Sequence, residues 1–84
     1  MSTEVITYIT DLARYLTDCS QMWERERTQA IEARGHVAAR SAALVGGVSN
    51  QQAVLSGLEF RIEFCQRQII RANRELRELS EKAL

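Results

Sequence analysis

The chain contains no proline, one histidine and two cysteines, and each shortage removes a class of structure or chemistry. The absence of proline favours long uninterrupted helices, because proline breaks the hydrogen-bond ladder of a helix interior. Cys19, Cys65 and His36 are too few ligands for a zinc site. No run of about 18 consecutive apolar residues is present, so we expect no membrane-spanning segment.

Charge and the first residues of the chain point to a soluble protein. The formal net charge is zero, so no excess of charge draws the whole chain onto nucleic acid or a membrane. Residues 1–10 lack the basic start and apolar core of a secretory signal. Both cysteines sit among apolar positions, as small buried hydrophobes do in a reducing compartment. We therefore expect a cytoplasmic protein with free thiols.

A seven-residue apolar repeat in the second half of the chain is the clearest signal. Its positions alternate at spacings of three and four: Leu55, Leu58, Ile62, Cys65, Ile69, Ala72, Leu76, Leu79 and Ala83. This spacing forms one stripe along an α-helix, which a partner helix must cover. The first half has a stripe of the same rhythm: Val5, Ile9, Leu12, Leu16, Cys19 and Trp23. The two stripes predict an all-α fold.

The glycine pair at 46 and 47 separates the two stripes. One of these glycines can close a helix C-terminus, and Ser49 or Asn50 can cap the next helix. We predict one domain over residues 1–84. Its first helix spans about residues 3–45, a turn follows at 46–49, and the second helix spans about residues 50–82. So short a turn makes the helices antiparallel, which gives a coiled-coil-like hairpin that assembles into a helical bundle.

Gly35 lies inside the first predicted helix and weakens it by about 1 kcal/mol relative to alanine. The structural alternative is therefore a three-helix arrangement, broken near Gly35, with a short helix over residues 36–45.

Matching the stripes outward from the turn gives a predicted register. It sets Trp23 near Leu76, Glu26 near Asn73, Arg40 near Glu59, Cys19 near Leu79, and Cys65 near Ala33 or Arg34. The thiols are then many helical turns apart, beyond the reach of a disulfide. Leu84 comes level with about Tyr15, so residues 3–14 overhang the second helix.

The predicted overhang is rich in apolar side chains, each of which gains roughly 1.5–3 kcal/mol when fully buried. A second protein, a second copy of the chain or a folded-back segment has to cover them. Phe60 and Phe64 lie one turn apart and off the main stripe, which indicates either a second contact surface or a wider seam. Tyr8, Tyr15 and Met22 flank the first stripe in the same way. The candidate partner or oligomer interface comprises Val5, Ile6, Tyr8, Ile9, Leu12, Tyr15, Phe60 and Phe64.

Four arginines gather on the outer face of the second predicted helix: Arg67, Arg71, Arg74 and Arg77. They are candidates for contact with phosphate or with an acidic partner. The alternative is a solvated face, because each has a glutamate four residues away that can pair with it along the helix.

No nucleophile beside a base and no glycine-rich phosphate loop is present, so we expect no enzyme and no cofactor. The leading hypothesis is a small protein-protein interaction module, an adaptor, co-chaperone or assembly subunit, whose partner is another protein or itself. In architecture alone, the layout resembles the small hairpin co-chaperones of bacterial type III secretion. The alternatives are a dimeric nucleic-acid binder that uses the arginine face and a phage-type inhibitor of a host protein.

Overall fold

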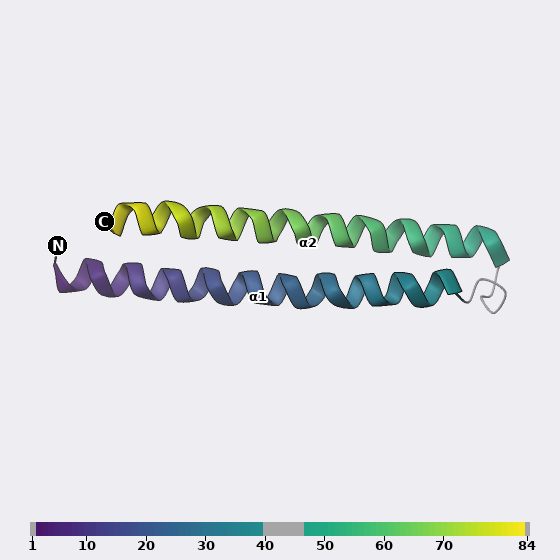
Figure 1. Cartoon of the computed structure of the whole chain (residues 1–84), viewed down its shortest axis with the longest axis horizontal. Coiled ribbons are helices and arrows are strands. Elements are labelled where there is room, and N and C mark those ends of the chain that lie inside the picture. The colour runs from purple at the N-terminus through teal and green to yellow at the C-terminus, as the bar shows by residue number, and fades with distance from the viewer. Residues whose placement is uncertain (1, 40–46, 84) are drawn as a thin grey trace.

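The computed structural model describes residues 2–39 and 47–83, which form two long helices. Helix α1 spans Thr3–Ala39 and helix α2 spans Gly47–Ala83. They run antiparallel and side by side, so the first turn of α1 and the last turn of α2 lie at the same end (Figure 1). The molecule is a rod with extents of 62 × 14 × 14 Å. The predicted all-α architecture of two packed helices is confirmed.

The start of α1 agrees with the sequence. The hydroxyl of Ser2 accepts a hydrogen bond from the backbone N–H of Val5 at 3.3 Å, and the Ser2 carbonyl accepts one from Ile6 at 3.1 Å. Serine is a preferred N-cap because its oxygen satisfies an N–H that has no partner inside the helix. Thr3 is therefore the first helical residue, as predicted.

Helix α1 continues through Gly35, so the alternative of a break at this residue is wrong. A Cβ atom added to Gly35 would meet nothing within 4 Å, so packing does not require a glycine there. The roughly 1 kcal/mol cost of glycine is small beside the packing of a long helix against its neighbour. The predicted end of the first helix, about residue 45, lies outside the described residues.

Helix α2 begins at Gly47 and not at about Asn50, so residues 47–49 belong to the helix and not to the predicted turn. The predicted turn residue Gly46 lies outside the described residues.

The predicted register is wrong. Asn73 is hydrogen-bonded to Ser20, not placed opposite Glu26, and Trp23 contacts the ring of Phe64 and not Leu76. These differences correspond to about two to three helical turns. When one helix is shifted by seven residues along the other, apolar positions face apolar positions again. The stripes alone therefore allow several alignments of the two helices.

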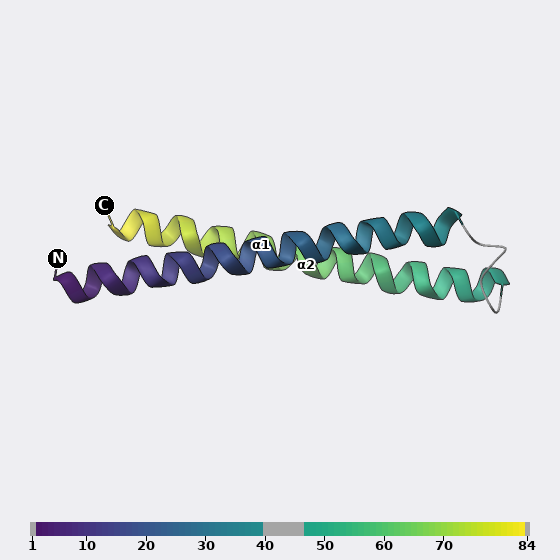
Figure 2. The ribbon, with the colours of Figure 1, turned by 90° about the horizontal axis from the view of Figure 1, so that it is seen from below.

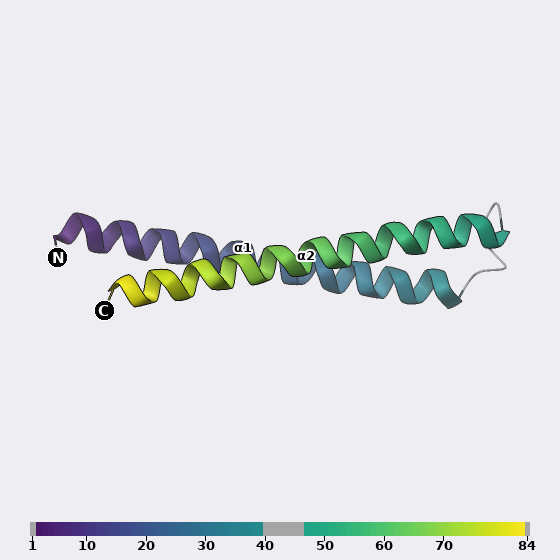
Figure 3. The ribbon, with the colours of Figure 1, turned by 90° about the horizontal axis from the view of Figure 1, so that it is seen from above.

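The corrected register removes most of the predicted overhang. Figure 1 shows α2 running almost to the N-terminal end of α1, and Figures 2 and 3 show the helices crossing near their middle. Ile9 and Leu12 are half-buried, whereas Val5, Ile6 and Tyr8 remain exposed by 45%, 51% and 67%. The end of α1 thus has a partner within the chain, although several of its apolar side chains stay in solvent.

The core is a single seam between the helices. Its buried apolar members among the described residues are Leu16, Ala30, Ile62, Cys65, Ile69 and Ala72. The register defined by the contacts above places Trp23 opposite Cys65 and Leu16 opposite Ala72, so large side chains face small ones. This pairing lets the helices approach closely and leaves Cys65 fully buried, at 0% exposure. Half of the six buried side chains are alanine or cysteine, so the core is thin.

The corrected register also moves the cysteines. Cys19 comes opposite Ile69, and Cys65 comes opposite Trp23, so the thiols lie about one turn apart along the hairpin and not many turns apart. Both are free, with Cys19 half-buried and Cys65 buried.

Candidate protein-protein interface

Aromatic side chains collect along one side of the hairpin. Tyr8, Tyr15 and Met22 recur every seven residues of α1, so they share one side of that helix. They are exposed by 67%, 63% and 40%. Trp23 and Phe64 of α2 continue the same surface toward the middle of the rod. We call this surface the aromatic face: Tyr8, Tyr15, Met22, Trp23 and Phe64.

Trp23 and Phe64 join the two helices within the aromatic face. Their ring centroids lie 5.4 Å apart with an interplanar angle of 77°, an edge-to-face contact. Trp23 is half-buried, and Phe64 is 41% exposed. Edge-to-face pairs contribute about 0.5–1.5 kcal/mol beyond the area they bury. The contact therefore holds Phe64 in place without a partner, while Phe60, one turn earlier, is 66% exposed.

A shallow groove runs beside Trp23 where the two helices meet. Its lining comes from both helices: Tyr15, Leu16, Cys19, Trp23, Gln68, Arg71, Ala72 and Glu75. The volume of about 200 Å³ is below the roughly 300–1,000 Å³ of typical small-molecule sites. A groove of this size suits a single inserted side chain better than a cofactor.

The phenol of Tyr15 stands at the edge of this groove. A hydrogen bond with the Cys19 thiol, together with the charge of that thiol when ionised, raises the pKa of Tyr15, and burial and the charge of Glu75 add to the effect. The phenol therefore keeps its proton at neutral pH. Tyr15 presents an apolar ring with a hydroxyl donor at its tip, a combination enriched at protein interfaces.

The structure brings together only part of the predicted interface. Tyr8, Tyr15 and Phe64 lie on the aromatic face. Phe60 lies on the outer side of α2, which it shares with Arg67 at a spacing of seven residues. Ile6 lies on another side of α1, which it shares with Ser20 at a spacing of fourteen residues. Val5, Ile9 and Leu12 follow the seam and face the last turns of α2. Met22 and Trp23 complete the face, and the seven-residue step from Tyr15 to Met22 is the sequence signal that identifies Met22.

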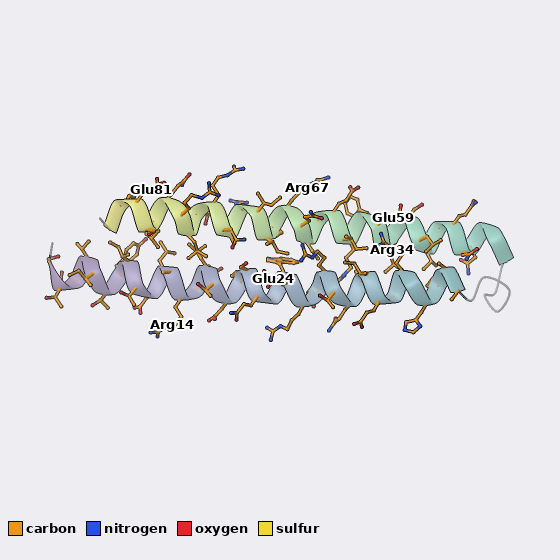
Figure 4. All side chains as sticks on the ribbon, viewed as in Figure 1. Arg14, Glu24, Arg34, Glu59, Arg67 and Glu81 are labelled. Carbon is orange, nitrogen blue, oxygen red and sulfur yellow. The ribbon has the colours of Figure 1, made fainter. Side chains whose placement is uncertain are left out.

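The opposite side of the hairpin is polar. Ser20 is buried, at 6% exposure, and its hydroxyl donates to the side-chain oxygen of Asn73 at 3.1 Å. Arg34 and Glu59 lie level with one another across the helices (Figure 4), where the predicted register placed Arg40 beside Glu59. This side carries the exposed Ile6 but none of the aromatic side chains.

Glu26 interrupts the apolar stripe of α1 and forms an ion pair with Arg61 of α2. The hydrogen bond and charge of Glu26 raise the pKa of the Arg61 guanidinium. Two of the predicted four-residue ion pairs form on the outer face of α2: Arg67 with Glu63 at 3.6 Å and Arg71 with Glu75 at 3.4 Å.

Arg74 and Arg77 form no ion pair with the other residues that the structure describes. Arg67, Ile70, Arg71 and Arg74 share one open surface hollow with Glu75 and Glu78. Figure 4 shows Arg67 pointing away from α1. Arg67 and Arg74 therefore lie on the outer side of α2, whereas Arg71 also lines the groove beside Trp23. Two of the four arginines are already paired with glutamates.

The described part of the chain limits the chemistry further. Within residues 2–39 and 47–83, no group of three or more His, Cys, Asp or Glu side chains could hold a metal ion. Over the same residues, neither helix has an apolar window sufficient to cross a bilayer. Comparisons of the chain with protein-family models, with curated proteins and with solved structures gave no match.

Proposed function

We propose that this chain is a small protein-protein interaction module that works by packing helix against helix, as an adaptor, co-chaperone or assembly subunit. The observation that carries the proposal is the aromatic face. Three of its five side chains are aromatic residues more than 40% exposed, and a fourth, Trp23, is half-buried beside them. Aromatic residues and methionine are enriched at protein interfaces, whereas isolated exposed apolar residues are common on any surface.

The form of the surface favours a protein partner. The face extends along α1 from Tyr8 to Met22, which is about 21 Å of helix, and continues onto α2 through Phe64. A small groove beside Trp23 lies within it. A long ridge with one shallow groove fits the side chains of another helix.

Substitution of the face tests this function. Tyr15→Arg with Met22→Arg places two charges on the face without touching the buried seam, so helicity should be retained. A matched control is Ile31→Arg, because Ile31 is 41% exposed and Met22 is 40% exposed, but Ile31 lies off the face. Chemical cross-linking followed by mass spectrometry should show that the double variant loses complexes that Ile31→Arg keeps. Equal cross-linking of the two variants would refute the proposed role of the face.

A second candidate function, nucleic-acid binding, is favoured by the shared hollow of Arg67, Arg71 and Arg74. Phosphate binding through arginines weakens steeply as salt increases. Retention of RNA or DNA that is lost in Arg71→Glu with Arg74→Glu, and that falls with salt, would support it. The ion pairs that Arg67 and Arg71 already make with glutamates reduce the charge available for phosphate.

A further inference from the structure

We infer that the occupant of the aromatic face is a second copy of this chain, so that two hairpins form a four-helix bundle. The inference rests on the proposed function and names the partner. In such a bundle, Tyr8, Tyr15, Met22 and Phe64 of each copy would lie between the two hairpins, and the groove beside Trp23 would receive a side chain of the other copy. The seam would then become one side of a larger core.

Surface area supports a partner of this size. The chain has an accessible surface of 6395 Å² and a mass of 9.6 kDa. A compact monomer of that mass exposes about 5,100 Å², so the rod exposes about 1,300 Å² more. A stable interface of standard size buries about 800 Å² on each partner. The excess surface of one hairpin therefore exceeds what a stable dimer requires from each copy.

The dimensions of the hairpin give a similar value for the area that a partner could cover. One side measures 62 Å by 14 Å between Cα atoms, which is a footprint of about 870 Å² and close to the per-partner area of a standard interface. A second hairpin of equal length covers this footprint from end to end. Burial of the three exposed rings of Tyr8, Tyr15 and Phe64, at about 150–250 Å² per fully buried ring, would supply much of the apolar part.

The charge of the chain permits self-association. Its eleven basic and eleven acidic residues give a formal net charge of zero. Proteins far from zero net charge repel their own copies, whereas a neutral chain meets no such barrier. An exposed aromatic surface on a neutral rod therefore meets its own copies without a net repulsion.

The other sides of the rod are less suited to this contact. The side of Ser20 and Asn73 is occupied by a hydrogen bond within the chain and by Arg34 and Glu59. The outer side of α2 carries Arg67 and its neighbouring arginines, which would be brought close together in a symmetric contact. The aromatic face combines exposed aromatic side chains with a groove where the two helices meet.

Analytical ultracentrifugation of the full chain over a concentration series tests the inference. The wild type should sediment with twice the 9.6 kDa chain mass and dissociate only on dilution. Tyr15→Arg with Met22→Arg should remain helical by circular dichroism and weaken the dimer by at least about tenfold. Ile31→Arg should leave the dimer unchanged. Phe64→Arg is a second disrupting variant, from the other helix.

The results of these measurements distinguish a second copy of the chain from a different protein partner. A wild type that stays monomeric at every concentration overturns the second copy. If that monomer binds a different protein and loses it on Tyr15→Arg with Met22→Arg, the interaction module survives with another partner. If the dimer forms but is weakened by Ile31→Arg and not by Tyr15→Arg with Met22→Arg, the aromatic face is not the dimer interface. If neither a dimer nor any complex depends on the face, both proposals fail.

Discussion

The hydroxyl of Ser20 donates a hydrogen bond to the side-chain oxygen of Asn73 at 3.1 Å, and it joins residues 53 positions apart. Ser20 is the one polar side chain that is buried among the residues the structure describes. The pair forms only in one alignment of the two helices, because sliding either helix by one turn separates the two side chains. It therefore selects among alignments that the apolar stripes leave open.

Substitution of the two partners of this hydrogen bond should lower the unfolding free energy by unequal amounts. Asn73→Ala leaves the Ser20 hydroxyl buried without its partner, which costs about 1–3 kcal/mol of unfolding free energy. Ser20→Ala leaves Asn73, which is exposed, free to bond water, so its cost should be smaller. Urea denaturation of both single variants and of the double variant gives the coupling energy. A coupling energy of zero would contradict a role for the pair in stability.

The two adjacent isoleucines of α2 should respond in opposite ways to charge. Ile69 is buried at 7% exposure, and Ile70 is 52% exposed. Ile69→Asp places a carboxylate in the apolar seam, which costs several kcal/mol, so circular dichroism should show a largely unfolded chain. Ile70→Asp is the matched control and should keep its helicity. Similar loss of helix in both variants would show that the seam is assigned to the wrong side of α2.

The side chain of Gln51 in α2 is hydrogen-bonded to the last described turn of α1. Its side-chain amide donates to the carbonyl of Val37 at 3.2 Å and to that of Ala38 at 3.5 Å. Both carbonyls belong to the last described turn of α1, where a side-chain donor can support the end of a helix. Gln51→Ala should lower the unfolding free energy by about 0.5–1 kcal/mol and speed amide exchange near the end of α1. Gln52→Ala, at an exposed neighbour, should do neither.

The glycines within the helices offer a stabilising change. A Cβ atom at Gly35 or at Gly57 would meet nothing within 4 Å, and both residues lie in continuous helix. Gly35→Ala and Gly57→Ala should each raise the unfolding free energy by about 0.5–1 kcal/mol, because alanine loses less backbone entropy than glycine in a helix. Thermal unfolding measures this gain. A loss of stability at Gly35 alone would indicate that α1 needs to break there.

The two thiols should differ in reactivity. Cys19 is half-buried, whereas Cys65 has 0% exposure. A thiol reagent reaches a buried cysteine only through opening of the fold. Cys19 should therefore react in the folded state, and Cys65 should react at the rate of unfolding, which rises in urea. Mass spectrometry after timed labelling distinguishes the two sites. Equal rates in the absence of denaturant would contradict the packing of Cys65 against α1.

The fold was largely predictable because the apolar stripe of α2 is dense and unbroken. Leu58, Ile62 and Ile69 recur at a spacing that only a helix places on one side. The N-cap at Ser2 confirms the predicted start of the first helix, since serine satisfies the free N–H groups at that point.

The register was not predictable by the same means, because a repeat of constant period matches itself at several offsets. Two features decide it, and neither follows from periodicity. Trp23 requires a small residue opposite, which Cys65 supplies, and Ser20 requires a polar partner, which Asn73 supplies. Matching side-chain volumes across the seam would have distinguished this alignment from the predicted one.

The aromatic face was identified in part. Tyr8, Tyr15 and Phe64 stood out because they are bulky and off the stripe. Trp23 belongs to the stripe, so its contribution to the face depends on the position of α2 beneath it and on the contact with Phe64. The face is therefore a property of the assembled hairpin and not of either helix alone.

The aromatic face exists only in the alignment of the helices that brings Trp23 to Phe64. Nuclear Overhauser spectroscopy of the folded chain measures this alignment most directly, because Trp23 is the only tryptophan. Ring centroids 5.4 Å apart predict strong cross-peaks between the Trp23 indole protons and the Phe64 ring protons. Cross-peaks from the indole to the methyl groups of Leu76, with none to Phe64, would contradict the alignment and the face built on it.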